Sequence, residues 1–172
     1  MSMVDYVDFY KQVLDGLIDR LRLSLKIDFL VDHLDEKVST SESNLQRGAD
    51  YYIVIKPGGH SALDGRSIQS KSIQTMDWGY RLEMYVRFIE RKEEWSRFTA
   101  FRSAVEYHLI MNRYLDATVI EGESLAVVPN VENISITPAG EAGYYRITPE
   151  AVMPNFMTQP LNVTVRQRVR YG

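Results

Sequence analysis

The sequence predicts a single α+β domain in which a mostly antiparallel β-sheet is flanked by an N-terminal helix and a central helix. Two observations predict the helices: apolar residues recur at three- and four-residue steps over about 3–22, and they do so again over about 92–115. A third favours the sheet, because apolar and polar residues alternate over 79–91 and over 161–171. The length of 172 residues suits one domain, so we expect 1–172 to fold around one core.

The first third of the chain predicts a helix, a loop and a strand. Ser2 and Asp5 nearly match a capping box at the start of the helix. A short strand or a helical extension is expected near 27–31, and the polar stretch 35–49 is expected to be a loop. The segment 50–59 is rich in β-branched and aromatic residues, so it predicts a strand that stops at its Pro-Gly-Gly end. The apolar stripe of the helix comprises Val7, Tyr10, Leu14, Leu17 and Leu21.

The remainder predicts a second helix between long strands. We expect 60–77 to form a loose hairpin or mobile loop, and 79–91 to form a long strand with one face on the core. Several prolines and glycines interrupt 116–160, which favours irregular structure with short strands, and the final strand is expected to close the sheet. The predicted core stripe of the second helix comprises Trp95, Phe98, Phe101, Val105, Leu109 and Leu115.

Composition excludes several kinds of site. The chain has no cysteine, which excludes disulfides, thiolate zinc sites and cysteine nucleophiles. Its net charge of −3 argues against a generally basic nucleic-acid binder. Apolar runs are too short to span a membrane, and the first residues lack the apolar core of a signal peptide.

Candidate catalytic motifs fail on spacing. Gly59-His60-Ser61-Ala62-Leu63 lacks the second glycine of a nucleophile elbow. His60, Ser61 and Asp64 are therefore better interpreted as a turn than as a triad. The histidines do not pair at metal-ligand spacing, and the glycines do not match a phosphate loop. We predict no enzyme activity, no metal site and no cofactor.

The last predicted strand has three arginines on its polar face, namely Arg166, Arg168 and Arg170. They are interpreted either as protection of an exposed sheet edge or as a contact surface. The preceding segment 116–150 holds six acidic residues against Arg146 alone. This asymmetry is either solvated surface or a sign that the acidic segment of one copy meets the basic strand of another.

The order of these elements resembles the tail-terminator and tail-completion proteins, which form neck rings in long-tailed bacteriophages. The resemblance rests on the strand GYRLEMYVRFIER, which runs into the amphipathic helix KEEWSRFTAFRSAVEYHL, and on the terminal strand LNVTVRQRVRY. It implies a β-sheet flanked by helices. It also implies a ring, usually of six copies, that stops polymerisation of the tail tube and offers the head-side connector a docking surface.

The resemblance further implies a location and partners. It places the protein in the neck of the virion, after synthesis in the cytoplasm of the bacterial host. The implied partners are further copies of the chain, the tail-tube protein and a head-completion or connector protein. DNA would pass through the lumen of the ring without specific binding, and neither a membrane nor a cofactor is implied. The hairpin 60–75 would become ordered on binding. The residues expected at contacts are Arg81, Arg87, Arg166, Arg168, Arg170, His60, Arg66 and Lys71.

Three alternatives stay open at this point. Another head–tail connector or the tail-tube subunit is the nearest, and a tube subunit would polymerise alone into long tubes. A small nucleic-acid-binding module that uses the arginine strand is the second, and it would bind duplex DNA with steep salt dependence. An enzyme is the third, and it would need a pocket that the sequence motifs do not predict.

Overall fold

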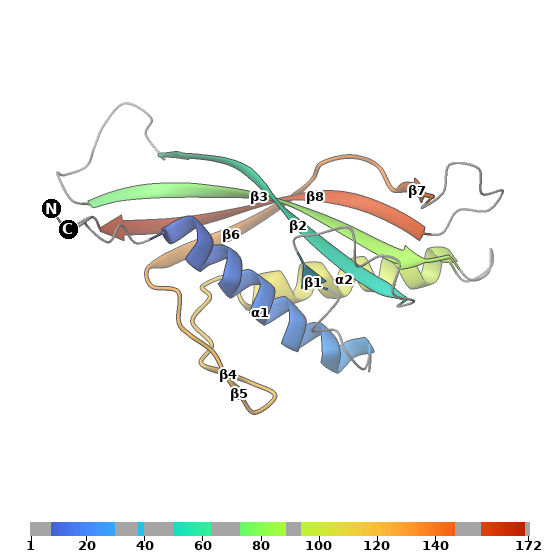
Figure 1. Cartoon of the computed structure of the whole chain (residues 1–172), viewed down its shortest axis with the longest axis horizontal. Coiled ribbons are helices and arrows are strands. Elements are labelled where there is room, and N and C mark those ends of the chain that lie inside the picture. Colours follow the sequence, from blue (N-terminus) through green and yellow to red (C-terminus); the bar gives the residue numbers. More distant parts are fainter. Residues whose placement is uncertain are drawn as a thin grey trace, which may run out of the picture.

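A computed structural model describes residues 8–29, 38–39, 50–62, 73–88, 94–146 and 156–170. Both long helices lie on one side of a twisted β-sheet (Figure 1), so the predicted α+β fold with a mostly antiparallel sheet is confirmed. None of the described helices is long and apolar enough to cross a membrane. The elements are α1 (Phe9–Phe29), β1 (Val38–Ser39), β2 (Tyr51–Ala62), β3 (Ile73–Arg87), α2 (Glu94–Met111), β4 (Val119–Ile120), β5 (Glu123–Ser124), β6 (Val131–Pro138), β7 (Gly143–Tyr145) and β8 (Phe156–Arg170).

The main sheet has the strand order β1-β2-β3-β8-β6, and β7 also pairs with β8. All pairings within it are antiparallel except the short one between β1 and β2. Strands β3 and β8 pair over their full lengths, from Ile73 opposite Arg170 to Arg87 opposite Phe156. The last described strand therefore lies in the interior of the sheet.

Helix α1 differs from its predicted bounds. It begins at Phe9, where the side chain of Asp8 accepts a hydrogen bond of 2.9 Å from the backbone N–H of Lys11. It continues to Phe29, so 27–29 is the helical extension rather than the strand. Leu25, which lies beyond the predicted end at about residue 22, is buried in the core and accounts for the later end of the helix. The predicted cap at Ser2 lies outside the described residues.

The core forms between the two helices and the inner face of the sheet. The predicted alternation is confirmed on β3 and β8, whose apolar positions are buried against the helices. The prediction that Trp95 belongs to the core is wrong. Its side chain is 57% exposed and stacks on Phe98, with the ring centroids 6.2 Å apart. The buried members from these elements are Met76, Trp78, Tyr80, Leu82, Met84, Val86, Phe98, Phe101, Val105, Leu109, Met157, Leu161, Val163, Val165 and Val169.

Gln167 lies on the apolar face of β8 and is fully buried. Its amide oxygen accepts a hydrogen bond of 3.0 Å from the Trp78 indole N–H. Its amide nitrogen donates one of 2.8 Å to the carbonyl of Pro129. Because a buried amide is costly unless it is hydrogen-bonded, these two partners explain how a polar residue is tolerated there.

The β2–β3 hairpin corrects the prediction that the strand stops at Pro57. Strand β2 continues to Ala62, with a register shift between Pro57 and His60. A bulge of this kind absorbs extra residues, so pairing resumes with His60 opposite Trp78. The predicted loop 60–77 is consequently strand at both of its ends, and 63–72 lies outside the described residues.

The segment 116–160 contains short strands, as predicted, but it also contains two longer ones. Strand β6 has eight residues, and β8 begins at Phe156 rather than at Leu161. The additional β8 residues pair with β3 and β7. Residues 147–155 lie outside the described part of the chain.

Arg20 is a buried cation that joins α1 to the segment after α2. Its guanidinium donates hydrogen bonds to the carbonyls of Gly16 (3.2 Å), Leu115 (2.8 Å), Ala117 (3.0 Å) and Ala126 (3.0 Å). Burial lowers the pKa of Arg20, and the carboxylates of Asp19 and Asp116 act in the opposite direction. The side chain stays charged, because an arginine does not lose its proton in proteins.

Replacing Arg20 with alanine should destabilise the protein by about 3 kcal/mol or more, because buried carbonyls lose charged donors. Chemical denaturation measures this loss. Arg22→Ala is the matched control, since Arg22 is on the same helix and makes longer ion pairs of 3.7 and 3.8 Å at the surface. Its cost should stay near 1 kcal/mol or less. Equal losses in the two variants would contradict a structural role for Arg20.

Candidate functional site

The candidate site is the face of the sheet that points away from the helices, which we call the open face (Figure 1). The alternating polar positions of β8 lie on it and include the three predicted arginines. Arg166 lies where β8 pairs with β3 on one side and with β6 on the other, so it does not protect a sheet edge. The pairing with β6 ends at Gln167 and Arg170 lies beyond it, so both interpretations, edge protection and a contact surface, stay open for Arg170.

Two of the β8 arginines have acidic neighbours in their own chain. Arg166 binds Asp77 on β3 through two hydrogen bonds, from Nε to Oδ1 (2.9 Å) and from Nη2 to Oδ2 (3.3 Å). This pair raises the pKa of Arg166. Arg168 lies 3.8 Å from Glu132 of β6. Arg170 is exposed at the end of the strand. The acidic segment therefore meets the basic strand within one chain, at least through Glu132.

A second charged cluster surrounds Glu83 nearer the other end of β3. Its carboxylate accepts hydrogen bonds from the Tyr85 hydroxyl (2.6 Å) and Arg81 Nε (3.1 Å), and it lies 3.4 Å from Lys56 Nζ. Burial alone would raise the pKa of Glu83. The hydrogen bond from Tyr85, the charge and hydrogen bond of Lys56 and the hydrogen bond from Arg81 outweigh that effect, so the pKa of Glu83 lies below its usual value of 4.5.

Beyond Glu83 the open face becomes aromatic. Tyr52, Tyr85 and Phe156 are buried together with Val54, and Tyr145 of β7 packs against them. Their rings meet edge to face, as with Tyr52 and Phe156 at 5.7 Å. The guanidinium of Arg87 lies 5.1 Å from the centroid of the Phe156 ring and 3.7 Å from Asp50. This predicted contact residue is thus part of a packed cluster.

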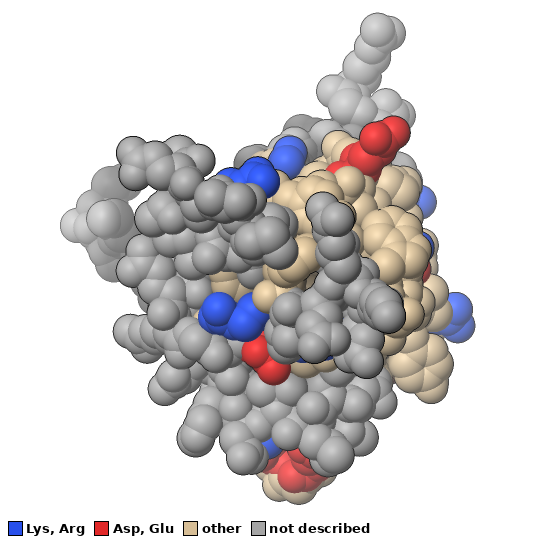
Figure 2. Space-filling view, turned by 90° about the vertical axis from the view of Figure 1, so that its right-hand side faces the viewer, with Lys and Arg blue, Asp and Glu red and all other residues tan. Residues whose placement is uncertain are grey.

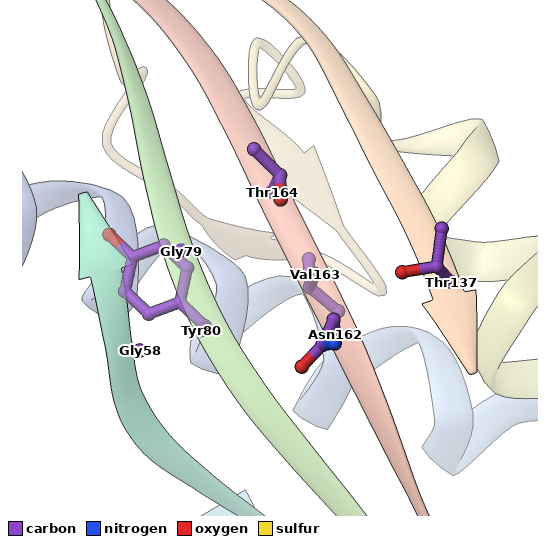
Figure 3. Close-up of a pocket in the computed structure, with 7 residues that line it drawn as sticks. All are labelled: Gly58, Gly79, Tyr80, Thr137, Asn162, Val163 and Thr164. Atoms are coloured by element: carbon purple, nitrogen blue, oxygen red, sulfur yellow. The ribbon is translucent and has the colours of Figure 1, made fainter. Parts of the chain in front are cut away.

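A shallow polar trough of about 380 Å³ crosses the open face between the two charged clusters. Its lining comes from β2, β3, β8 and β6, and Thr137 lies opposite Asn162 on neighbouring strands (Figure 3). The glycines and threonines in this lining have small side chains, so the backbones of four neighbouring strands are accessible there. The lining residues are Gly58, Gly79, Tyr80, Thr137, Asn162, Val163 and Thr164.

Tyr10 of α1 holds the sheet beneath this trough. Its hydroxyl donates to the carbonyl of Gly79 (3.0 Å) and accepts from the N–H of Gly58 (3.2 Å). Burial raises the pKa of Tyr10, while the Gly58 hydrogen bond acts in the opposite direction. The Tyr80 hydroxyl donates to the Tyr10 carbonyl (2.8 Å), and the two rings stack with centroids 4.6 Å apart. One helix residue thereby fixes both strands at the point where the register of β2 shifts.

The charge of the open face has the opposite sign to that of the whole chain. The described strands of the main sheet place six basic and three acidic residues on this face, whereas the whole chain has a net charge of −3. Figure 2 views one end of the molecule, where basic and acidic side chains are interspersed among the described residues. The basic residues are Lys56, Arg81, Arg87, Arg166, Arg168 and Arg170, and the acidic residues are Asp77, Glu83 and Glu132.

The structure brings five of the predicted contact residues to the open face, namely the arginines of β3 and β8. His60 is in β2, opposite Trp78, and not in a turn as predicted. Ser61 is likewise in β2, opposite Asp77. Arg66 and Lys71 lie outside the described residues. Sequence reasoning missed Asp77 and the trough, although the glycines at 58 and 79 were a usable signal for close strand contact.

Within the described ranges, no three histidine or acidic side chains gather in a group that could hold a metal ion. A comparison with known protein families and with curated proteins finds no match for this chain. The open face and the order of the elements are therefore the features that bear on function.

Gly58→Ala should destabilise the protein by about 1–3 kcal/mol, because the new Cβ would lie 2.9 Å from the backbone carbon and oxygen of Gly79. Thermal or urea denaturation measures the effect. Gly143→Ala in β7 is the control, since nothing lies within 4 Å of a Cβ there. The close contact would be disproved if both variants were as stable as the parent chain.

The Glu83 cluster should make stability depend on pH. A carboxylate whose pKa is lowered by folding stabilises the fold above its unfolded value of 4.5, and this contribution is lost as the pH falls through the folded pKa. Glu83→Gln should therefore cost about 1–2 kcal/mol near pH 7 and less near pH 3. Urea denaturation at both values tests this. Exposed Glu141→Gln is the control, and a cost that is unchanged at pH 3 would contradict the assignment.

Proposed function

We propose that this chain is a structural virion protein that forms a ring, terminates a bacteriophage tail tube and joins it to the head-side connector. The observation that carries the proposal is the arrangement of β8, an arginine-bearing strand inside the sheet whose polar side is exposed. The order of helix, β-hairpin, helix and last strand agrees with the resemblance drawn from the sequence. The partners in this proposal are further copies of the chain, the tail-tube protein and a head-completion protein.

The open face suits a broad protein contact better than a small ligand. Its trough is shallow and is flanked by charged pairs that are already formed, so a partner would meet a broad, preorganised surface. Exposed carboxylates elsewhere on the chain have the complementary charge, including Asp116, Glu121 and Glu123 near the β4–β5 hairpin. A contact between two unlike surfaces repeats around a ring when the rotation closes.

The nearest alternative is another head–tail connector or the tail-tube subunit, which would use the same surface in a different assembly. A nucleic-acid-binding module is the alternative from another class, and the excess of basic residues on the open face favours it. Two of the three β8 arginines already have acidic neighbours in the chain, which reduces the charge available to phosphates. Binding to duplex DNA with a steep salt dependence would support this alternative.

Replacing Arg166, Arg168 and Arg170 together with serine should abolish or strongly weaken the ring. The monomer should stay folded, because such exposed ion pairs contribute only about 0–1 kcal/mol each. Native mass spectrometry of the parent chain should detect a closed ring, with six copies expected, and electron microscopy should show it capping tail tubes. Serine substitution of Lys11, Arg22 and Lys26 on α1 is the control for loss of charge.

Two results would count against the proposal. A triple arginine variant that still forms a ring and caps tubes would remove these residues from the interface. A parent chain that polymerises alone into long tubes would favour the tube-subunit alternative.

A further inference from the structure

Helix α2 is apolar on two opposite sides. Phe98, Phe101, Val105 and Leu109 are buried against the sheet and α1. On the opposite side, Tyr107, Ile110 and Met111 are 54–63% exposed, where a surface helix is usually polar, and Tyr114 in the turn after the helix is 43% exposed. With aromatic side chains of about 150–250 Å² each, the four expose on the order of 400 Å² of apolar surface. A patch of that size on a monomer is often a site of interaction.

The side chains on this exposed side of α2 change in size along the helix. In its N-terminal half the exposed residues are small, namely Ser96, Ala100 and Ser103. Together with Tyr107 and Ile110 they follow alternating steps of four and three residues. That spacing is the seam along which two helices pack in a coiled coil. The stripe therefore has a small half and a large half.

The stripe is complementary to itself when a second copy runs antiparallel. If the two-fold axis crosses α2 at the level of Val105, whose own side chain is buried on the other side of the helix, Ile110 of one copy lies over Ala100 of the other. Tyr107 then lies over Ser103. Each pair combines a large side chain with a small one, so the two helices approach closely without a void. A parallel pair would place large on large at one end and small on small at the other.

We propose that the exposed side of α2 is the contact surface for α2 of a second copy of this chain, packed antiparallel about a two-fold axis. Arg113 lies over the ring of Tyr114 at 4.8 Å, so the end of the patch has a charged rim. The two Glu106 side chains approach each other near the axis, and Arg102, 4.0 Å from Glu106 in its own chain, offsets part of their repulsion. The small apolar area makes this a weak, concentration-dependent dimer, since standard interfaces bury about 800 Å² per partner.

This contact does not depend on the proposed function. Helix α2 lies on the other side of the sheet from the open face (Figure 1), so both surfaces can be occupied at once. A two-fold contact closes at two copies, whereas the proposed ring needs contacts between unlike surfaces. Loss of one contact therefore leaves the other measurable.

Cysteine cross-linking tests the geometry, because the parent chain contains no cysteine that could interfere. The double variant A100C/I110C should form a covalent dimer on mild oxidation, as seen by non-reducing electrophoresis. A100C and I110C alone should not, because equal positions in an antiparallel pair lie about 15 Å apart along the axis at 1.5 Å per residue. No dimer from the double variant, or an equally fast dimer from A100C alone, would overturn the proposal.

Sedimentation equilibrium over a concentration series gives the second test. Ile110→Glu and Ala100→Trp should each weaken dimerisation at least tenfold, the first by burying a charge and the second by filling the small half of the stripe. Val127→Glu, at an apolar residue that is 45% exposed outside the stripe, is the matched control and should leave the dimer unchanged. Circular dichroism checks that all three variants fold. A parent chain that stays monomeric at several hundred micromolar would refute the contact.

Discussion

The buried guanidinium of Arg20 is the interaction on which the arrangement of the second half of the fold depends. A guanidinium buried in a protein costs several kcal/mol unless its donors are satisfied. Here the two terminal nitrogens reach four carbonyls, three of which lie in 115–126, while Nε has no hydrogen-bond partner among the described residues. Gly16, one turn earlier, permits the close approach, because a Cβ there would lie 2.6 Å from Val128. The segment so held leads directly into β6, which pairs in the sheet with β8, the strand that bears the arginines of the open face.

The sequence predicted the fold best where a pattern repeats within a single strand or helix. Alternation correctly divided β3 and β8 into a core side and an exposed side, because that division depends on neighbouring residues of one strand. The Pro-Gly-Gly signal predicted the wrong end for β2. The strand continues past Pro57 because it is held by Tyr10, a residue that lies far away in the sequence. Trp95 was assigned to the core for a similar reason. Helical spacing indicates which residues share a side of the helix. It does not indicate whether the sheet extends far enough to cover the first turn, where Trp95 lies.

The candidate site was predictable in part. Alternation placed Arg166, Arg168 and Arg170 on one side of their strand, and the structure agrees. Their partners were not predictable, because the contact between Arg166 and Asp77 requires the register between two strands. The interior position of β8 was missed for the same reason. The exposed stripe on α2 was present in the sequence as a seven-residue pattern, but only the burial of Phe98 and Phe101 shows which side is left to solvent.

The interior position of β8 also has a consequence for the order of folding. It follows all the other described strands in the chain, so ribosomal synthesis delivers β3 and β6 before their common neighbour exists. Until β8 emerges, one edge of β3 and both edges of β6 lack a partner among the described strands, and such edges can pair with other chains. Closing the sheet also requires contacts between distant residues, which are slow to form. The nascent chain is therefore most prone to aggregation just before β8 inserts between the two strands.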